Sequence, residues 1–329
     1  LIIKNIKNVS YGQTSFKDTN LVSTQGAGIL GVFGQNGSGK SALLDSVALF
    51  KTLASGKSLT SFDKYLVNRL AKEAQVDIYL SLQIEDVTYE IIYALSLVLD
   101  RKDRLNIKQE TIKYKADASR RYKTLIKASL ENNIAVIKNE KTITKMSLAT
   151  NKSLLFNEQV RASLNAFKQK ILEVIGRYAS ENILIISNFT SRELKYRDEF
   201  PLVYYAKSNG ASRHYMALRY GINYLTAHDF ALFKVIVAKI SLVLDKIIPN
   251  INLGYIIHPS KNDKYALELV TNRDGVTLPL KFESIGVKKL VLVLGALLSM
   301  YNANNVLVVI DEIDTGIFEY LLGEIFLVL

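Results

Sequence analysis

One stretch limits the fold of this chain of 329 residues more than any other: residues 30–47 read LGVFGQNGSGKSALLDSV. Residues 34–41 satisfy the pattern G-x-x-x-x-G-K-[ST] in full. The apolar run GILGVFG before the loop predicts a strand, and the spacing of the apolar residues after it predicts a helix. The sequence therefore predicts an α/β fold in which a glycine-rich loop joins a strand to a helix.

This loop has the residue types that bind the phosphates of a nucleotide. Its glycines allow backbone conformations that turn successive N–H groups toward phosphate oxygens, and the helix N-terminus adds partial positive charge. We expect Lys40 to reach the β- and γ-phosphates as a catalytic group, and the Ser41 hydroxyl to bind Mg²⁺. The predicted cofactors are ATP and Mg²⁺. The predicted nucleotide-binding residues of the loop are Gly34, Asn36, Gly37, Ser38, Gly39, Lys40, Ser41 and Ala42.

A second motif supplies carboxylates. Five apolar residues, Val306 to Ile310, precede Asp311 and Glu312. A magnesium site of this kind needs a carboxylate at the end of a buried strand. We expect Asp311 to hold Mg²⁺ through water and Glu312 to polarise the attacking water as the main catalytic group. The alternative is an ordinary strand that leaves a core.

Several features favour one class of ATPase. The loop GQNGSGKS resembles the G-x-N-G-[SA]-G-K-S loop of ABC-type ATPases, including the SMC and DNA-repair branches. These proteins carry a signature, S-x-G-x-[KQ], shortly before the Asp-Glu pair, and Ser284, Gly286 and Lys288 fit it. The resemblance implies a head-to-head homodimer, or a higher homo-oligomer, in which Ser284 and its helix face the γ-phosphate held by the opposite subunit.

The interval between the two motifs is too long for a transporter cassette, and it lacks the heptad arms of SMC proteins. The chain resembles the compact ATPases of the OLD and AAA-15/AAA-21 group, many of which belong to bacterial anti-phage defence systems. The typical E-S-x-G-T-[KR]-[KR]-L occurs here as ESIGVKKL, with Val287 in place of threonine, and DEIDTGI matches the D-E-[IL]-D-x-G-[IL] ending. The resemblance gives Asp314 the role of coupling two ATP sites.

Some features of that group have no clear match. We choose Gln75 as the glutamine that contacts the metal, and Gln83 is the alternative. The switch histidine is not found, because His214, His228 and His258 all precede Asp311 and are interpreted as ordinary residues.

The composition limits the cellular environment in which the chain is expected and leaves the role of one basic segment open. The chain has no cysteine, which excludes disulfides and zinc–thiolate sites and fits a cytoplasmic protein, and no apolar run is long enough to cross a membrane. The net charge is +11, and residues 101–152 contain 14 Lys/Arg against 5 Asp/Glu. This segment is either a surface for DNA, RNA or an acidic partner, or a solvated lysine-rich insertion.

We therefore expect a P-loop NTPase head of the ABC type with an inserted region of helices and strands. The predicted domains are an N-terminal lobe (1–99), a basic and largely helical insertion (100–215) and a C-terminal lobe (216–329) whose end is incomplete. We expect hairpins with turns at Glu85-Asp86 and Asp274-Gly275, one helix over 158–178, and another that ends before Pro249.

Two functions remain open. The first is an ATP-driven dimerising switch in a defence system that controls an effector nuclease or toxin. The second is a DNA-repair or recombination ATPase that binds nucleic acid through residues 101–152.

Overall fold

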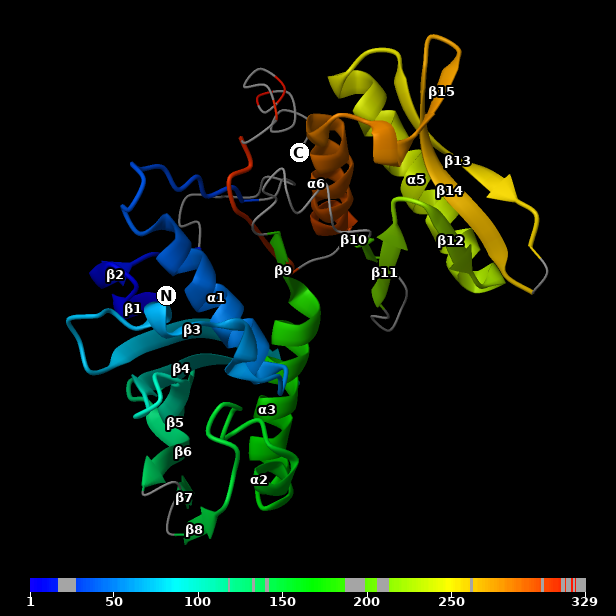
Figure 1. The fold of residues 1–329 in the computed structure, drawn as a ribbon. Helices are drawn as coiled ribbons and strands as arrows, with labels where there is room; N and C mark the ends of the chain where they lie inside the picture. Colours follow the sequence, from blue (N-terminus) through cyan, green and yellow to red (C-terminus); the bar gives the residue numbers. More distant parts are fainter. Residues whose placement is uncertain are drawn as a thin grey trace. The chain divides into compact units, whose positions relative to one another are not determined.

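The computed structural model describes residues 1–16, 28–117, 119–131, 134–139, 142–186, 199–205, 213–260, 263–302, 305–314, 317, 321 and 323. The chain divides into two compact units (Figure 1). Unit 1 comprises Leu1–Val22 and Ile29–Ile183, and unit 2 comprises Ser23–Gly28 and Leu184–Leu329. Each unit is a mixture of helices and antiparallel strands, so the expected α/β class is confirmed.

An antiparallel sheet of eight strands organises unit 1, in the order β2-β1-β3-β4-β5-β6-β7-β8. The strands are β1 (Ile2–Ile6), β2 (Val9–Gln13), β3 (Ala74–Ile84), β4 (Val87–Leu99), β5 (Leu105–Ala116), β6 (Lys123–Glu131), β7 (Ile134–Asn139) and β8 (Thr142–Met146). The helical segments are α1 (Lys40–Ala54), η1 (Leu59–Ser61), η2 (Lys64–Leu66), α2 (Glu158–Ala162), α3 (Ala166–Arg177) and η3 (Tyr178–Asn182).

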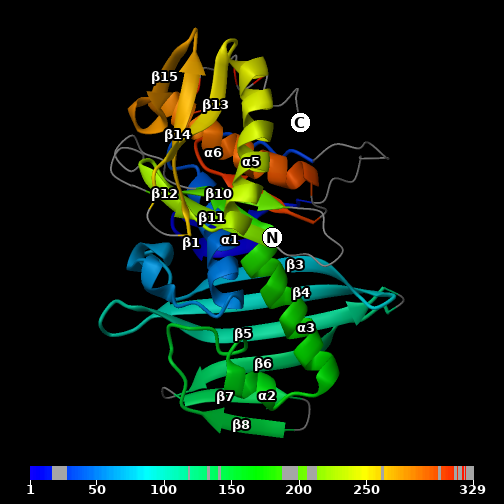
Figure 2. The same ribbon diagram turned by 90° about the vertical axis from the view of Figure 1, so that its right-hand side faces the viewer.

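The sheet has a buried face and an open face because its strands alternate apolar and polar residues. In β3, Ala74, Val76 and Ile78 are buried, whereas Gln75 and Tyr79, which alternate with them, are exposed. Helices α1 and α3 cover the buried face, and Figure 2 views the sheet from their side. The rings of Phe50 on α1 and Tyr93 on β4 lie 5.4 Å apart, so aromatic packing fixes α1 against the sheet.

The predicted turn at Glu85-Asp86 joins β3 to β4 and is confirmed, with Glu85 at φ 55°. Several other predictions for unit 1 are wrong. The helix expected over 158–178 is broken after Ala162, because the Asn165 side chain accepts a hydrogen bond from the Lys168 N–H and starts a new helix.

The second error concerns the basic segment, which is not largely helical. Residues 105–146 form β5 to β8, and helices begin only at Glu158. The reason is visible in β5, where Lys113 is exposed and Ile112 is buried, so that neighbouring residues take opposite faces of a sheet. Unit 1 also ends at Ile183, whereas the predicted domain limits lay at 99 and 215.

The strand expected immediately before the glycine-rich loop is also not formed. A strand requires a paired neighbour, and none of the described strands pairs with residues 28–34. Apolar side chains of this segment are therefore exposed, with Ile29 at 55% and Phe33 at 92%.

A buried carboxylate joins the sheet of unit 1 to the chain that leaves it. Glu110 on β5 accepts hydrogen bonds from the Tyr93 hydroxyl at 2.5 Å and from the Ser153 hydroxyl at 3.0 Å. It also accepts from the N–H groups of Leu154 and Leu155. Burial raises the pKa of Glu110 above its ordinary value of 4.5, and the hydrogen bonds oppose this shift only in part.

Unit 2 has several smaller sheets around an apolar core. Its strands are β9 (Ile183–Ile186, which begins at the last residue of unit 1), β10 (Glu199–Tyr205), β11 (Arg213–Arg219), β12 (Ile222–Leu225), β13 (Ile251–His258), β14 (Tyr265–Arg273), β15 (Val276–Pro279) and β16 (Leu307–Ile310). Its helical segments are α5 (Ala227–Ile247), η4 (Leu280–Phe282) and α6 (Ile285–Asn302). Strand β14 lies between β12 and β13 and also pairs with β15, β10 pairs with β11, and β9 pairs with β16.

The core of unit 2 forms between α5, α6 and the β13–β14 pair, and includes Phe233, Leu267 and Val291. Two predictions are confirmed here. Helix α5 ends at Ile247, before Pro249, and the turn between β14 and β15 has Asp274 at φ 49° and Gly275 at φ 81°. Among the described residues, no helix is long and apolar enough to cross a membrane.

The raised pKa of Glu110 predicts how the free energy of unfolding depends on pH. Because burial raises this pKa, the folded protein keeps the proton to a higher pH than the unfolded chain does. The free energy of unfolding of the wild type, relative to Glu110→Gln, should therefore fall as the pH rises above about 4.5. Urea unfolding of both proteins over this pH range measures it. A difference that stays constant would mean that Glu110 is ionised in the folded protein.

Candidate functional site

The glycine-rich loop ends at the N-terminus of α1, as its sequence predicts. Gly39 is the residue before the helix and has φ 101°, and Gly37 has φ 84°. Both values lie in the left-handed region, where side chains with a Cβ atom are strained. The loop residues from Gly34 to Ser38 are exposed, and Gly39 is half-buried.

Two loop glycines also leave little space for a side chain. A Cβ atom on Gly39 would lie 2.4 Å from Val9 Cγ2 on β2, and one on Gly34 would lie 2.5 Å from Ser38 Oγ. The clash at Gly34 can be relieved by rotation of the Ser38 side chain, whereas Gly39 also has a positive φ, so the path of the loop requires glycine at Gly39. The loop is therefore a tight glycine-rich turn before a helix, the arrangement whose backbone N–H groups bind phosphate.

Lys40 lies over the curl of the loop. Its ammonium nitrogen is 2.5 Å from the Gly34 carbonyl oxygen and 3.0 Å from the Gln35 carbonyl oxygen. The neighbouring residues Ser41 and Ala42 belong to the first turn of α1, with Ser41 exposed and Ala42 buried. Asn36 and Ser38 are exposed, and the Ser38 N–H donates to the Gln35 carbonyl at 3.1 Å.

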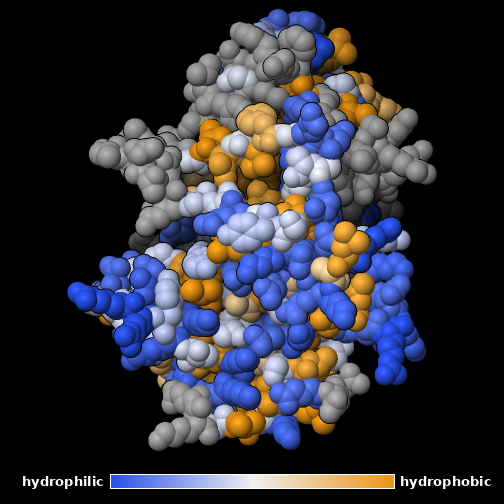
Figure 3. All heavy atoms as spheres, turned by 90° about the vertical axis from the view of Figure 1, so that its left-hand side faces the viewer, coloured by the Kyte–Doolittle hydropathy of each residue, from blue (hydrophilic) through white to orange (hydrophobic). Residues whose placement is uncertain are grey.

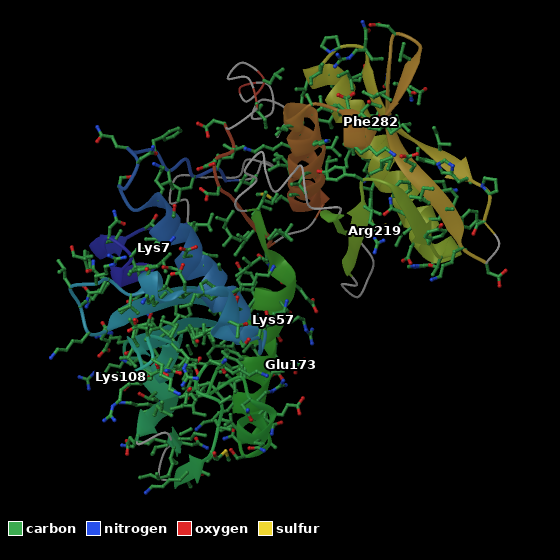
Figure 4. The ribbon with its side chains drawn as sticks, in the orientation of Figure 1. Lys7, Lys57, Lys108, Glu173, Arg219 and Phe282 are labelled. Atoms are coloured by element: carbon green, nitrogen blue, oxygen red, sulfur yellow. The ribbon has the colours of Figure 1, made fainter. Side chains whose placement is uncertain are left out.

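The β1–β2 hairpin holds this loop, a contribution that sequence reasoning missed. The Asn8 side chain donates a hydrogen bond to the Gly37 carbonyl, and Val9 contacts Gly39. Lys7, labelled in Figure 4, forms an ion pair with Asp45 on α1. The hairpin therefore fixes both the loop and the helix that follows it. No local pattern could have revealed these partners, because they are distant in the sequence.

The Asp-Glu pair follows a strand in unit 2, as predicted. The Asp311 N–H donates to the Ile186 carbonyl of β9 at 2.8 Å, which fixes the end of β16. Glu312 is exposed and has φ 46°, so the backbone turns sharply at this residue. Asp314 is exposed two residues further on. We call residues 311–314 the acidic turn.

A buried lysine contacts the acidic turn. Lys289 on α6 is only 1% exposed, and its ammonium donates a hydrogen bond to the Glu312 carbonyl. Burial lowers its pKa, while the charges of Asp314, Glu312 and Asp311 oppose the change. Sequence reasoning chose the neighbouring Lys288 and missed this residue. The available signal was a lysine next to an otherwise apolar helix, LVLVLGALL.

Lys288 points elsewhere. Its ammonium donates to the Lys281 carbonyl at 2.7 Å and lies 5.2 Å from the centre of the Tyr220 ring. Burial lowers its pKa as well. The two neighbouring lysines therefore have different partners, one in the acidic turn and the other near η4.

Ser284 caps α6, and Gly286 is in its first turn. The Ser284 hydroxyl oxygen accepts a hydrogen bond from the Val287 N–H at 3.3 Å, and Ser284 is exposed. Before it, the Glu283 carboxylate accepts hydrogen bonds from the Thr271 hydroxyl at 2.5 Å and from the Ser284 N–H at 3.2 Å. The start of this helix is thus held in place and open to solvent. Phe282, labelled in Figure 4, is 67% exposed in the same segment.

The structure brings the predicted site residues together in two groups. The loop residues and Gln75 belong to unit 1, whereas the acidic turn and the segment Ser284–Lys288 belong to unit 2, where α6 connects them. Gln75 is exposed on β3, and its side chain donates to the Glu73 carboxylate at 3.2 Å; Gln83 on the same strand is also exposed.

The three histidines were interpreted from the sequence as ordinary residues. His228 is an exposed residue of α5, and His258 Nε2 lies 3.4 Å from a Glu268 carboxylate oxygen. The side chain of His214 lies outside the described residues. In the described part of the chain, no group of three or more histidine or carboxylate side chains is arranged to hold a metal by itself.

The chain matches one protein family over residues 29–317, a range that includes the loop, the capped helix and the acidic turn. The family is AAA_21, described as "AAA domain, putative AbiEii toxin, Type IV TA system". The chain belongs to this AAA family. No curated protein matches it.

Membership of the AAA family makes the chain an ATPase domain, and the residues of unit 1 fit the nucleotide. The glycine curl offers backbone N–H groups, and the N-terminus of α1 and the Lys40 ammonium add positive charge. AAA-family ATPases generally use ATP with Mg²⁺, which is normally bound by few protein ligands together with phosphate oxygens.

The geometry of Gly39 gives a direct test of the loop. Gly39→Ala places a methyl group against Val9 and strains the backbone, so we expect ATP binding to weaken by about tenfold or more. Isothermal titration calorimetry with ATP and Mg²⁺ measures the affinity.

Gly56→Ala is the matched control. Gly56 also has a positive φ, 72°, but it follows the other end of α1, and its nearest atom outside the chain neighbours is 3.8 Å away. This variant should lose stability and keep its affinity for ATP. Equal affinities of Gly39→Ala and the wild type would show that the loop does not bind the nucleotide.

Proposed function

We propose that this AAA-family chain is an ABC-type switch ATPase that dimerises head to head around ATP and Mg²⁺. ATP binding joins two protomers, and hydrolysis separates them. In this proposal the nucleotide held by the loop of one protomer is closed by Ser284 and the N-terminus of α6 from the other protomer.

The observation that carries the proposal is the state of Ser284. It caps a helix of 18 residues, it is exposed, and the Glu283–Thr271 hydrogen bond holds the segment before it. A helix N-terminus that is open to solvent attracts anions. Ser284 is exposed beside the Glu283 carboxylate, so this end of α6 is open to solvent and to another molecule.

The remaining residues take the following roles in the proposal. Lys40 neutralises charge on the β- and γ-phosphates, and Ser41 and Asp311 would hold Mg²⁺. Gln75 has no role in this proposal, because its side chain lies on the open face of the sheet, opposite α1. Mg²⁺, when bound, offsets the negative charge of the phosphates. Glu312 accepts a proton from the attacking water, and Asp314 couples the two sites. Lys289 keeps the acidic turn in position through the Glu312 carbonyl.

We further propose that the switch regulates a nuclease or toxin effector in a bacterial anti-phage defence system. Two observations support this role. The motifs ESIGVKKL and DEIDTGI resemble those of defence ATPases, and the description of the family names a toxin of a type IV toxin–antitoxin system.

The test uses Glu312→Gln, which keeps the loop and removes the proton acceptor. With ATP and Mg²⁺ this variant should form dimers in light scattering coupled to size exclusion, and with ADP it should remain monomeric. Adding Ser284→Arg should abolish the dimer and leave the affinity of the monomer for ATP within about threefold of the parent.

Thr277→Arg is the control for the new side chain, because Thr277 is exposed on β15 in the same unit. It should dimerise like the parent. Monomers of Glu312→Gln at saturating ATP would contradict the proposed switch and leave only a nucleotide-binding domain.

A further inference from the structure

The open face of the unit 1 sheet can be read from the register of its strands. Residues paired across neighbouring strands share a face, so the cross-strand rows through Gln75, Asp77 and Tyr79, which alternate along β3 with buried residues, mark this side. One row runs from Tyr11 through Lys4 and Gln75 to Ser96, Gln109, Ser129, Val136 and Lys145. A parallel row runs from Asp77 through Ala94 and Thr111 to Lys127, Lys138 and Ile143.

Lysines dominate the charge of this face. Two shorter rows add Lys113, opposite Ile92, and Lys115, opposite Glu90. The lysines of these rows are Lys4, Lys113, Lys115, Lys127, Lys138 and Lys145, and their carboxylates are Asp77, Glu90 and Glu131. Glu73 adds a carboxylate that accepts hydrogen bonds from Gln75 and Ser96 and is paired with Lys108. Glu90 is itself paired with Lys115 at 3.0 Å. The face is therefore basic, mainly over β5 to β8.

Exposed tyrosines lie among these charges. Tyr79 is 47% exposed and pairs with Ile92, and Tyr11 is 57% exposed at the β2 edge. The Tyr122 hydroxyl donates to Glu90 at 2.6 Å, and the Lys115 ammonium lies 5.2 Å from the centre of its ring. The Tyr122 ring is therefore held on the same face. Burial and the charge of Glu90 raise the pKa of Tyr122 to about 12.

The described helices of the unit lie on the other side of the sheet, although Ser96, Thr111 and Val136 of these rows are buried. Helices α1 and α3 pack on the opposite side, and Figure 3, which shows the side away from them, has hydrophilic residues over much of the region of β3 to β8. In Figure 4, Lys57 and Glu173 lie with the helices, whereas Lys108 lies with the strands.

From this arrangement we propose that the open face binds single-stranded nucleic acid, with tyrosine rings stacking on bases and the lysines contacting phosphates. A flat sheet face with exposed aromatic rings suits unstacked bases, which a duplex does not offer. A surface for an acidic protein would need the lysines and would not need the rings. The proposal does not rest on ATP hydrolysis or on dimerisation.

The test measures fluorescence anisotropy of a labelled single strand of mixed sequence, as RNA and as DNA, and of the corresponding DNA duplex. The full chain should bind a single strand more tightly than the duplex, and the RNA and DNA arms show which strand is preferred. Lys113→Glu combined with Lys127→Glu should weaken binding by about tenfold or more and reduce the salt dependence of the affinity. Tyr79→Ala should weaken it about fivefold or more and leave the salt dependence unchanged.

Lys57→Glu combined with Lys170→Glu is the matched control, since it makes the same change in net charge on the helical side. It should bind within about twofold of the wild type. Lys113→Ala combined with Lys127→Ala tests the same lysines if the double charge reversal does not fold.

Three results would overturn the proposal. One is no binding of any strand at low salt, and the second is an equal loss of affinity in the open-face variants and the control. The third is that the wild type binds duplex and single strand with equal affinity and that Tyr79→Ala does not change either affinity. This result would indicate a surface that binds phosphates through charge alone.

Discussion

The backbone path of the loop before α1 is the constraint on which the candidate site depends. Gly37 and Gly39 have left-handed conformations, and a Cβ atom on Gly39 would lie 2.4 Å from Val9 Cγ2. The rest of unit 1 keeps this path in place. The β1–β2 hairpin contacts the loop through Asn8 and Val9, and the Phe50–Tyr93 contact holds α1 on the sheet. A loop that is fixed before its ligand arrives avoids part of the entropy cost of ordering it.

In unit 2, the constraint is that the carboxylates of the acidic turn lie where the backbone turns sharply. The N–H of Asp311 is fixed by β9, and the ammonium of Lys289 reaches the Glu312 carbonyl from inside the core. Burying an ammonium is costly unless charges and hydrogen bonds compensate it, and the acidic turn provides both. The helix that carries Lys289 begins at Ser284, so one element connects the turn to the exposed cap.

Much of this could be predicted from short sequence patterns. The loop, the two hairpin turns, α5 and the strand before Asp311 all follow local rules of spacing and turn chemistry. The errors arose where local rules conflict. The segment 100–215 was predicted to be largely helical, whereas Leu105–Ala116 forms β5, and Asn165 divided a continuous apolar stripe into two helices. Asn8 and Lys289 could not have been found this way, because a pattern gives residue types and spacing but not the direction of a side chain or its distant partners.

In the proposed dimer, two protomers share each ATP site. Mixing two variants that are inactive for different reasons tests this arrangement. Lys40→Ala disables the loop and Ser284→Arg disables the cap, so each variant alone should fail to hydrolyse ATP. A mixed dimer contains one site built from the intact loop of one protomer and the intact cap of the other. If the ATP site is shared between protomers, mixing the two inactive proteins should restore ATP hydrolysis. A mixture that stays as inactive as its components, at concentrations where the wild type is fully active, would contradict it.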